Sequence, residues 1–137
     1  GVDYSLFFRE LSALPDDMSS LTRSFYHTPK DDAMKEWQNW LQAWRQSIEK
    51  SVKIEGSLAK ISETMRQANP KFIWREWLIV PAYKAAEKGD FTLIHRLQKI
   101  LTAPYDEQSK EVEATYYQRR PIEFFSAGGV AHYSCSS

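Results

Sequence analysis

Apolar residues recur every three or four positions along most of the chain, and this spacing predicts α-helices. The clearest case is a helix from Asp31 to about Ser51. Its apolar stripe consists of Ala33, Trp37, Trp40, Leu41, Trp44 and Ile48. A stripe of this kind faces a protein core. We therefore interpret its three tryptophans as packing residues rather than as a ligand site.

The same spacing predicts further helices on both sides of this one. They are expected over residues 4–14, 57–67, 70–88 and 91–101, with a short polar helix within 106–117 and a helical turn near 21–26. Prolines mark several ends, because the residue before a proline disfavours the helical conformation. Pro81 lies inside the predicted 70–88 helix, so we expect a kink or a split there.

The sharpest local signal is the pair Gly89-Asp90. Glycine is favoured just past the end of a helix, and aspartate is favoured as the cap that begins one. The pair therefore predicts a tight helical hairpin over residues 71–101.

These elements define an all-α protein, an irregular bundle of about five helices that includes the tight hairpin. The 137 residues suit one ordinary domain, and the 42% of hydrophobic residues can form a core. We expect residues 1–121 to be the helical region. We expect residues 122–137 to be a flexible, irregular tail that carries Cys135.

Charge and hydropathy narrow the classes of partner. The chain has 18 basic and 18 acidic residues, so its formal net charge is zero. A neutral chain lacks the basic surface that binds a phosphate backbone, and we expect no nucleic-acid partner. Its longest apolar run, 77–83, is far too short to cross a bilayer, and no signal segment opens the chain. We therefore expect no membrane partner.

Candidate chemistry is sparse. The three histidines, His27, His95 and His132, have no zinc-type spacing with one another or with the lone cysteine. The single Gly-Gly pair, 128–129, is not followed by a lysine, so no phosphate loop is predicted. We expect no catalytic residue, cofactor-binding residue or metal ligand in this chain. Cys135 cannot form a disulfide within the chain, which favours a reducing compartment.

Five segments, in this order, resemble the C-terminal portion of the selenoprotein O (SelO) pseudokinase family. They are Leu6–Ser12, Met65–Arg75, Ala86–Phe91, Pro104–Glu107 and Ser134–Ser137. The resemblance covers almost the whole chain, and it departs from the usual pattern at Glu76, where the family usually has asparagine. Within these segments the expected structural motif residues are Asn69, Pro70, Arg75, Gly89, Asp90, Pro104 and Tyr105.

The resemblance implies a parent protein with a kinase-like fold that transfers AMP from ATP to hydroxyl side chains of proteins. Its cofactors would be ATP and magnesium, and its motifs for them belong to an earlier part of the family's chain that this sequence lacks. The expected partners are the kinase-like catalytic part of the same parent and the parent's protein substrates. We expect this chain alone to be inactive and to hold no cofactor.

The family often places a selenocysteine or a cysteine near its C-terminus, and Cys135 falls on that position. The resemblance therefore implies a redox-regulatory role, in which Cys135 pairs with a cysteine elsewhere in the intact protein. A protein of this family would be cytoplasmic in bacteria and mitochondrial in eukaryotes.

Two alternatives to this interpretation stay open. The chain could be a free-standing helical protein-interaction module, or a thiol-based redox enzyme that uses Cys135 itself. Self-association of the purified chain tests the first, and a thiol titration tests the second. Gly1 in place of an initiator methionine favours a processed chain, a piece of a longer protein or a tag remnant.

Overall fold

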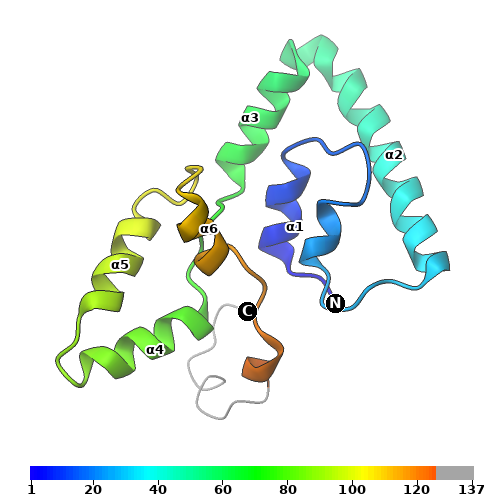
Figure 1. The fold of residues 1–137 in the computed structure, drawn as a ribbon. Helices are drawn as coiled ribbons and strands as arrows, with labels where there is room; N and C mark the ends of the chain where they lie inside the picture. Colours follow the sequence, from blue (N-terminus) through cyan, green and yellow to red (C-terminus); the bar gives the residue numbers. More distant parts are fainter. Residues whose placement is uncertain (126–137) are drawn as a thin grey trace. The chain divides into compact units, whose positions relative to one another are not determined.

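A computed structural model describes residues 1–125. Its elements in chain order are α1 (Tyr4–Leu11), η1 (Leu21–Ser24), α2 (Asp31–Glu55), α3 (Leu58–Ala68), α4 (Glu76–Ala86), α5 (Thr92–Leu101), α6 (Lys110–Tyr116) and η2 (Ile122–Phe125), where η marks a short 3-10 helix (Figure 1). Within this range the only β-type pairing is an isolated bridge between Val2 and Phe25. The predicted all-α class is therefore confirmed.

The chain divides into two compact units, Gly1–Pro70 and the residues from Lys71 onward. Unit 1 contains α1, η1, α2 and α3, and unit 2 contains α4, α5, α6 and η2. The first part of the predicted tail forms η2, and the rest, with Cys135, lies outside the described residues.

The core of unit 1 forms where α1, the segment around η1 and α2 meet. Its buried apolar residues are Phe7, Leu11, Met18, Leu21, Phe25 and Leu41. Phe7 lies at its centre, with ring contacts to Phe25, Trp37 and Trp40 at centroid distances of 6.3, 5.4 and 5.8 Å. Edge-to-face and tilted arrangements of this kind bury large areas and hold the helices in a defined register.

The tryptophans of α2 are only partly explained by core packing. Trp37 and Trp44 pack against the core, as predicted. Trp40 remains 39% exposed, so the packing interpretation does not account for it. The periodicity places Trp40 at the edge of the apolar stripe, where burial depends on what the neighbouring element covers.

Three predicted helix boundaries are wrong. The second helix continues to Glu55 rather than ending at about Ser51, and it stops at Gly56, which has φ of 96°. The first helix ends at Leu11 rather than residue 14, and Leu14 adopts a left-handed backbone with φ of 54°. The fourth helix begins at Glu76 rather than at Pro70 or Lys71. The backbone N–H groups of Lys71 and Phe72 donate instead to the Pro104 carbonyl, at 2.8 and 3.0 Å.

Pro81 lies inside α4 without splitting it. The helix pairs with α5, and this confirms the predicted hairpin. The hairpin corner has the hydrogen bonds of a Schellman motif, since the Asp90 N–H donates to the Ala85 carbonyl at 3.0 Å and the Gly89 N–H to the Ala86 carbonyl at 2.9 Å. Gly89 has φ of 85°, the left-handed conformation that glycine adopts most readily.

Asp90 differs slightly from its predicted role. The cap of α5 is Phe91, and Asp90 lies one residue earlier, where its Oδ1 accepts the Thr92 N–H at 3.0 Å. Hydrogen bonds from the side chain and then the backbone of Thr92 lower the pKa of Asp90 below its ordinary value. Because the folded pKa is lowered, the stabilisation is present at neutral pH and is lost as the pH falls through that lowered pKa.

Replacing Gly89 tests the corner directly. Gly89→Ala is expected to destabilise the chain by about 1 kcal/mol, because alanine resists a left-handed backbone. A β-carbon at Gly89 would meet no atom within 4 Å, so this cost is purely conformational. Gly89→Asn is the matched control and should cost clearly less, because asparagine tolerates this conformation. Urea denaturation measures both; equal costs for the two variants would contradict the conformational explanation.

Candidate functional site

The segment Asn69–Arg75, part of the Met65–Arg75 block that carries the family resemblance, crosses the boundary between the two units. We call it the motif segment. Two buried cations are associated with it: Arg9 of unit 1, which is 5% exposed and contacts Asn69, and Lys71, which belongs to the segment and is 7% exposed. Because a buried charge is costly unless it is paired, the groups around these two side chains show what the segment does.

Arg9 closes the end of α3. Its Nη1 donates to the carbonyls of Arg66 and Asn69, at 3.0 Å in both cases. The last carbonyls of a helix have no partner within the helix and carry partial negative charge, so a guanidinium suits them. Asn69 adds to the closure, since its Nδ2 donates to the Met65 carbonyl at 2.8 Å. The same amide lies 3.4 Å from the Ser12 hydroxyl, beyond the end of α1.

Lys71 forms an ion-pair cluster inside unit 2. Its ammonium donates to Glu113 Oε2 at 3.0 Å and to Glu107 Oε2. Its Nζ also lies 5.1 Å from the ring centroid of Tyr117 and 6.0 Å from that of Phe72, within the range of a cation–π contact. We call these five residues the Lys71 cluster. It joins the motif segment to the loop before α6 and to α6 itself.

The other predicted motif residues occupy three separate places. Pro104 supplies the carbonyl that accepts the N–H groups of Lys71 and Phe72, so it lies beside the motif segment. Tyr105 follows it and is 46% exposed, and Arg75 is the residue that precedes α4. Gly89 and Asp90 form the hairpin corner described above. The structure thus brings Pro104 to the motif segment but leaves Gly89 and Asp90 at the corner.

Glu76, the departure from the family pattern, faces Arg120. Its Oε2 lies 4.0 Å from Arg120 Nη2, and the Glu76 side chain is 10% exposed. The same Nη2 donates to the Phe124 carbonyl at 2.6 Å, and the guanidinium lies 5.0 Å from the Phe125 ring. Glu76 Oε1 and Arg120 Nε are buried without a hydrogen-bond partner. The glutamate is therefore accommodated by a nearby cation, with its hydrogen-bonding capacity only partly used.

Sequence reasoning missed the four charged residues that organise this region. Arg9, Lys71 and Glu107 all lie within segments that carried the family resemblance, which was the available signal. Glu113 carried no such signal. Their charges pair with groups that are distant in the sequence, and local spacing carries no signal for such pairing.

The arrangement holds segments together and leaves its charged groups occupied. Lys71 faces two carboxylates, and Arg9 faces two carbonyls.

Among residues 1–125 no three histidine, cysteine, aspartate or glutamate side chains gather as potential metal ligands. None of the helices in the described part of the chain is long and apolar enough to span a membrane. Cys135, the predicted redox residue, lies outside the described residues.

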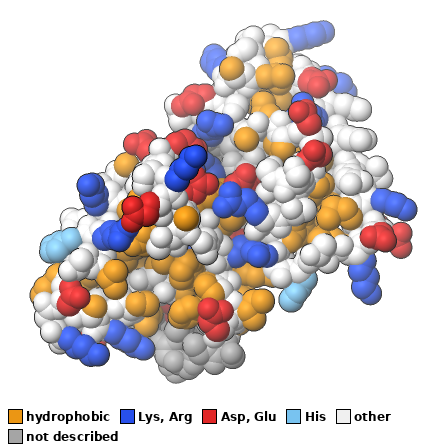
Figure 2. Space-filling model, viewed as in Figure 1, with side chains coloured by type: hydrophobic (Ala, Val, Ile, Leu, Met, Phe, Trp, Pro, Cys, Tyr) orange, Lys and Arg blue, Asp and Glu red, His pale blue; other side chains and the backbone are white. Residues whose placement is uncertain are grey.

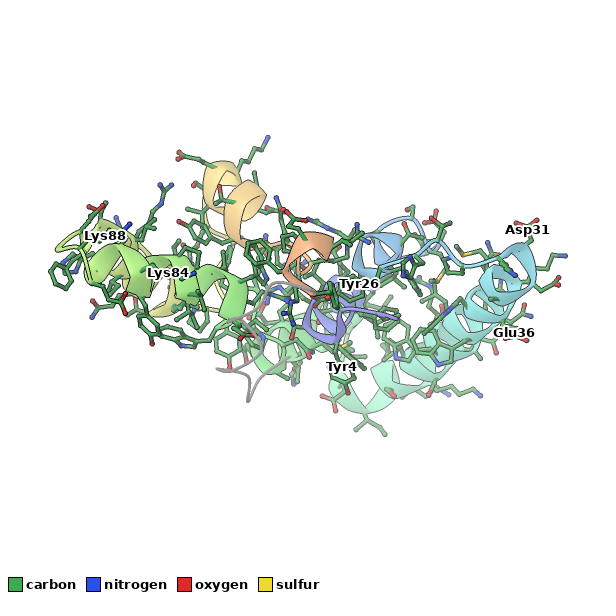
Figure 3. The ribbon with its side chains drawn as sticks, turned by 90° about the horizontal axis from the view of Figure 1, so that it is seen from below. Tyr4, Tyr26, Asp31, Glu36, Lys84 and Lys88 are labelled. Carbon is green, nitrogen blue, oxygen red and sulfur yellow. The ribbon has the colours of Figure 1, made fainter. Side chains whose placement is uncertain are left out.

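The surface of the described chain mixes both signs of charge. Figure 2 shows acidic and basic side chains interspersed, with hydrophobic side chains gathered over α4. Lys84 and Lys88 of this region point outward (Figure 3).

The Lys71 cluster predicts that removing both carboxylates destabilises the chain more than removing the lysine. Glu107→Gln combined with Glu113→Gln leaves a buried ammonium without a carboxylate, and should destabilise the chain by about 2 kcal/mol. That value is at the low end because the two carboxylate side chains are 56% and 34% exposed. Lys71→Met keeps an apolar stem against both rings and leaves the carboxylates near water, so it should stay within about 1 kcal/mol of the parent sequence. Urea denaturation ranks the variants; a larger loss for Lys71→Met would refute this account of the cluster.

A family profile and the curated relatives of this chain indicate the same protein family. The profile of the family described as "Protein adenylyltransferase SelO" matches residues 1–102. A protein nucleotidyltransferase YdiU from Vibrio parahaemolyticus is 38% identical over 138 residues, which is 98% of this chain and 26% of that protein. Relatives of the same name from Tolumonas auensis and an Azoarcus species are 36% and 32% identical over 141 residues, again 26% of each protein.

No solved structure matches the chain. The chain spans about a quarter of the length of the curated relatives it matches. The family profile covers most of the chain, and the relatives align with nearly all of it. The chain therefore belongs to the SelO family.

Proposed function

We propose that this chain is the helical C-terminal part of a longer SelO-family protein AMP-transferase. The observation that carries the proposal is the family membership together with the quarter-length coverage of the nucleotidyltransferase relatives. In this proposal the remaining length supplies the kinase-like catalytic part. The present chain supports that part and performs no chemical step on its own.

The proposed reaction transfers AMP from ATP to a hydroxyl side chain of a protein substrate. The hydroxyl oxygen forms a bond to the α-phosphorus of ATP, and the bond from that phosphorus to the bridging oxygen of the β-phosphate breaks. Pyrophosphate leaves, and the hydroxyl proton passes to a base of the catalytic part. Magnesium held with ATP in that part would supply the positive charge that offsets the charge developing on the phosphates.

The described contacts fit a supporting role. Arg9 and Lys71 both pair with groups inside the chain. Several backbone groups of the motif segment are also hydrogen-bonded. Each of the two helical units can present a surface to the catalytic part. In this proposal, the described residues of the resemblance segments stabilise the fold of the chain.

The proposal extends to Cys135 as a redox regulator. Its thiolate would attack a small disulfide of the cellular pool, such as oxidised glutathione, which gives a mixed disulfide and releases one thiol. A cysteine elsewhere in the parent would then displace the second thiol, so that the intramolecular disulfide forms as the small disulfide is reduced to two thiols. A disulfide at this position restricts the motion of the joined segments. Regulation of the catalytic part is the expected consequence.

An activity assay separates the chain from its parent. With ATP labelled at the α-phosphate and magnesium, the full-length parent should transfer label to protein, and the present chain alone should not. Calorimetry of the chain with magnesium-ATP should show no binding heat. Label transfer by the chain alone, or a micromolar nucleotide site on it, would overturn the proposed division of roles.

A cysteine variant tests the regulatory part. In the full-length parent, Cys135→Ser should make label transfer insensitive to the ratio of oxidised to reduced glutathione, whereas the unmodified parent should respond to it. Ser134→Ala, next to the cysteine, is the matched control and should respond like the parent. A redox response that survives Cys135→Ser would assign the regulation to another residue.

A further inference from the structure

The outward side of α1 in unit 1 carries aromatic rings where a solvent-facing helix normally carries polar residues. Tyr4 is 75% exposed, and its ring lies 4.5 Å from that of Phe8, one helical turn later. Figure 3 shows the Tyr4 side chain projecting outward from α1. The opposite side of α1 packs into the core of unit 1, where Leu6, Phe7 and Leu11 are buried.

These rings continue onto α2. Phe7 links the two helices, with ring centroids 5.6 Å from Phe8 and 5.8 Å from Trp40. Trp40 is 39% exposed and stacks on Trp44 with an interplanar angle of 16° at 6.3 Å. We call Tyr4, Phe8, Trp40 and Trp44 the aromatic face. Its two halves are linked through the buried Phe7 ring, and its exposed members are Tyr4 and Trp40, whereas Phe8 and Trp44 are half-buried against the core.

The part of α2 that carries the aromatic face is depleted of exposed charge. Its exposed positions between residues 38 and 47 are all uncharged: Gln38, Asn39, Trp40, Gln42, Ala43, Gln46 and Ser47. The one charged residue in this stretch, Arg45, donates to the carbonyls of Leu14 and Pro15 and pairs with Asp16 at 2.8 Å. Exposed charges return on both sides, at Glu36 and Glu49. Enriched aromatic residues with depleted charge are the composition of a buried protein–protein interface core.

The same composition argues against other partners. A nucleic-acid backbone or an anionic lipid surface is bound by lysine and arginine, and the exposed positions of this stretch contain neither. Rings with an uncharged polar surround suit an apolar protein surface, where Tyr and Trp commonly act as anchors.

We propose that the aromatic face is the surface through which unit 1 packs on the transferase portion of its own parent protein, an inference that rests on the proposed function above. This chain aligns with about a quarter of a relative's length, so under the proposed function a large protein surface is covalently attached to it. Attachment gives a high effective concentration, so a modest aromatic contact is enough to keep the two parts together.

Hydroxyl-radical footprinting with mass spectrometry compares this face in the chain and in the full-length parent. Oxidation of Tyr4 and Trp40 should fall about fivefold or more in the parent, because water is excluded from the core of an interface. His27, exposed in the same unit, is the control and should be oxidised equally in both. Equal oxidation of Tyr4 and Trp40 in the chain and the parent would overturn the proposal.

Two further measurements separate the competing outcomes. Protection that rises with concentration in the isolated chain would identify a second copy as the occupant and overturn the proposal. In the parent, Tyr4→Ser should raise Trp40 oxidation about twofold as the interface loosens, while Ile54→Ser, on the exposed end of α2, should leave it unchanged.

A parent that protects the rings but transfers no AMP would refute the proposed function alone, and a parent that transfers AMP with the rings exposed would refute this inference alone.

Discussion

The pairing of two buried cations is the constraint on which the organisation of this chain depends. An arginine or lysine removed from water must find hydrogen-bond acceptors. An unpaired buried charge lowers the stability of the folded state by roughly several kcal/mol. Arg9 meets this need with the carbonyls at the end of α3, and Lys71 meets it with Glu107 and Glu113. The motif segment is therefore held on the unit 1 side by one cation and on the unit 2 side by the other.

This constraint gives several residues of the segments that carry the family resemblance a structural task in the described chain. Asn69 completes the end of α3, Lys71 carries a charge that only this cluster satisfies, and Pro104 provides one carbonyl for two backbone N–H groups. The tasks of Asn69 and Lys71 need a particular side chain at a fixed place, whereas Pro104 contributes only its backbone carbonyl. A short family-specific block can thus reflect the demands of packing and pairing, without any contact with a substrate.

The sequence predicted what depends on local physics. Apolar spacing located the helices, and Gly89-Asp90 located the hairpin corner, because both signals act over a few residues. The start of α4 was missed because Lys71 and Phe72 bond to Pro104, more than thirty residues away along the chain. The burial of Arg9 and Lys71 was missed for the same reason. The exposure of Trp40 was missed because periodicity gives the width of an apolar stripe but says nothing about what lies opposite it.

Amide hydrogen exchange, read residue by residue by NMR, tests most directly whether the motif segment is a structural anchor. The account predicts that the N–H groups of Lys71 and Phe72 exchange as slowly as those in the middle of α5, although they lie outside any helix, because both donate to the Pro104 carbonyl. It also predicts that magnesium-ATP leaves these rates unchanged. Fast exchange at both amides, or slowing that requires the nucleotide, would contradict it.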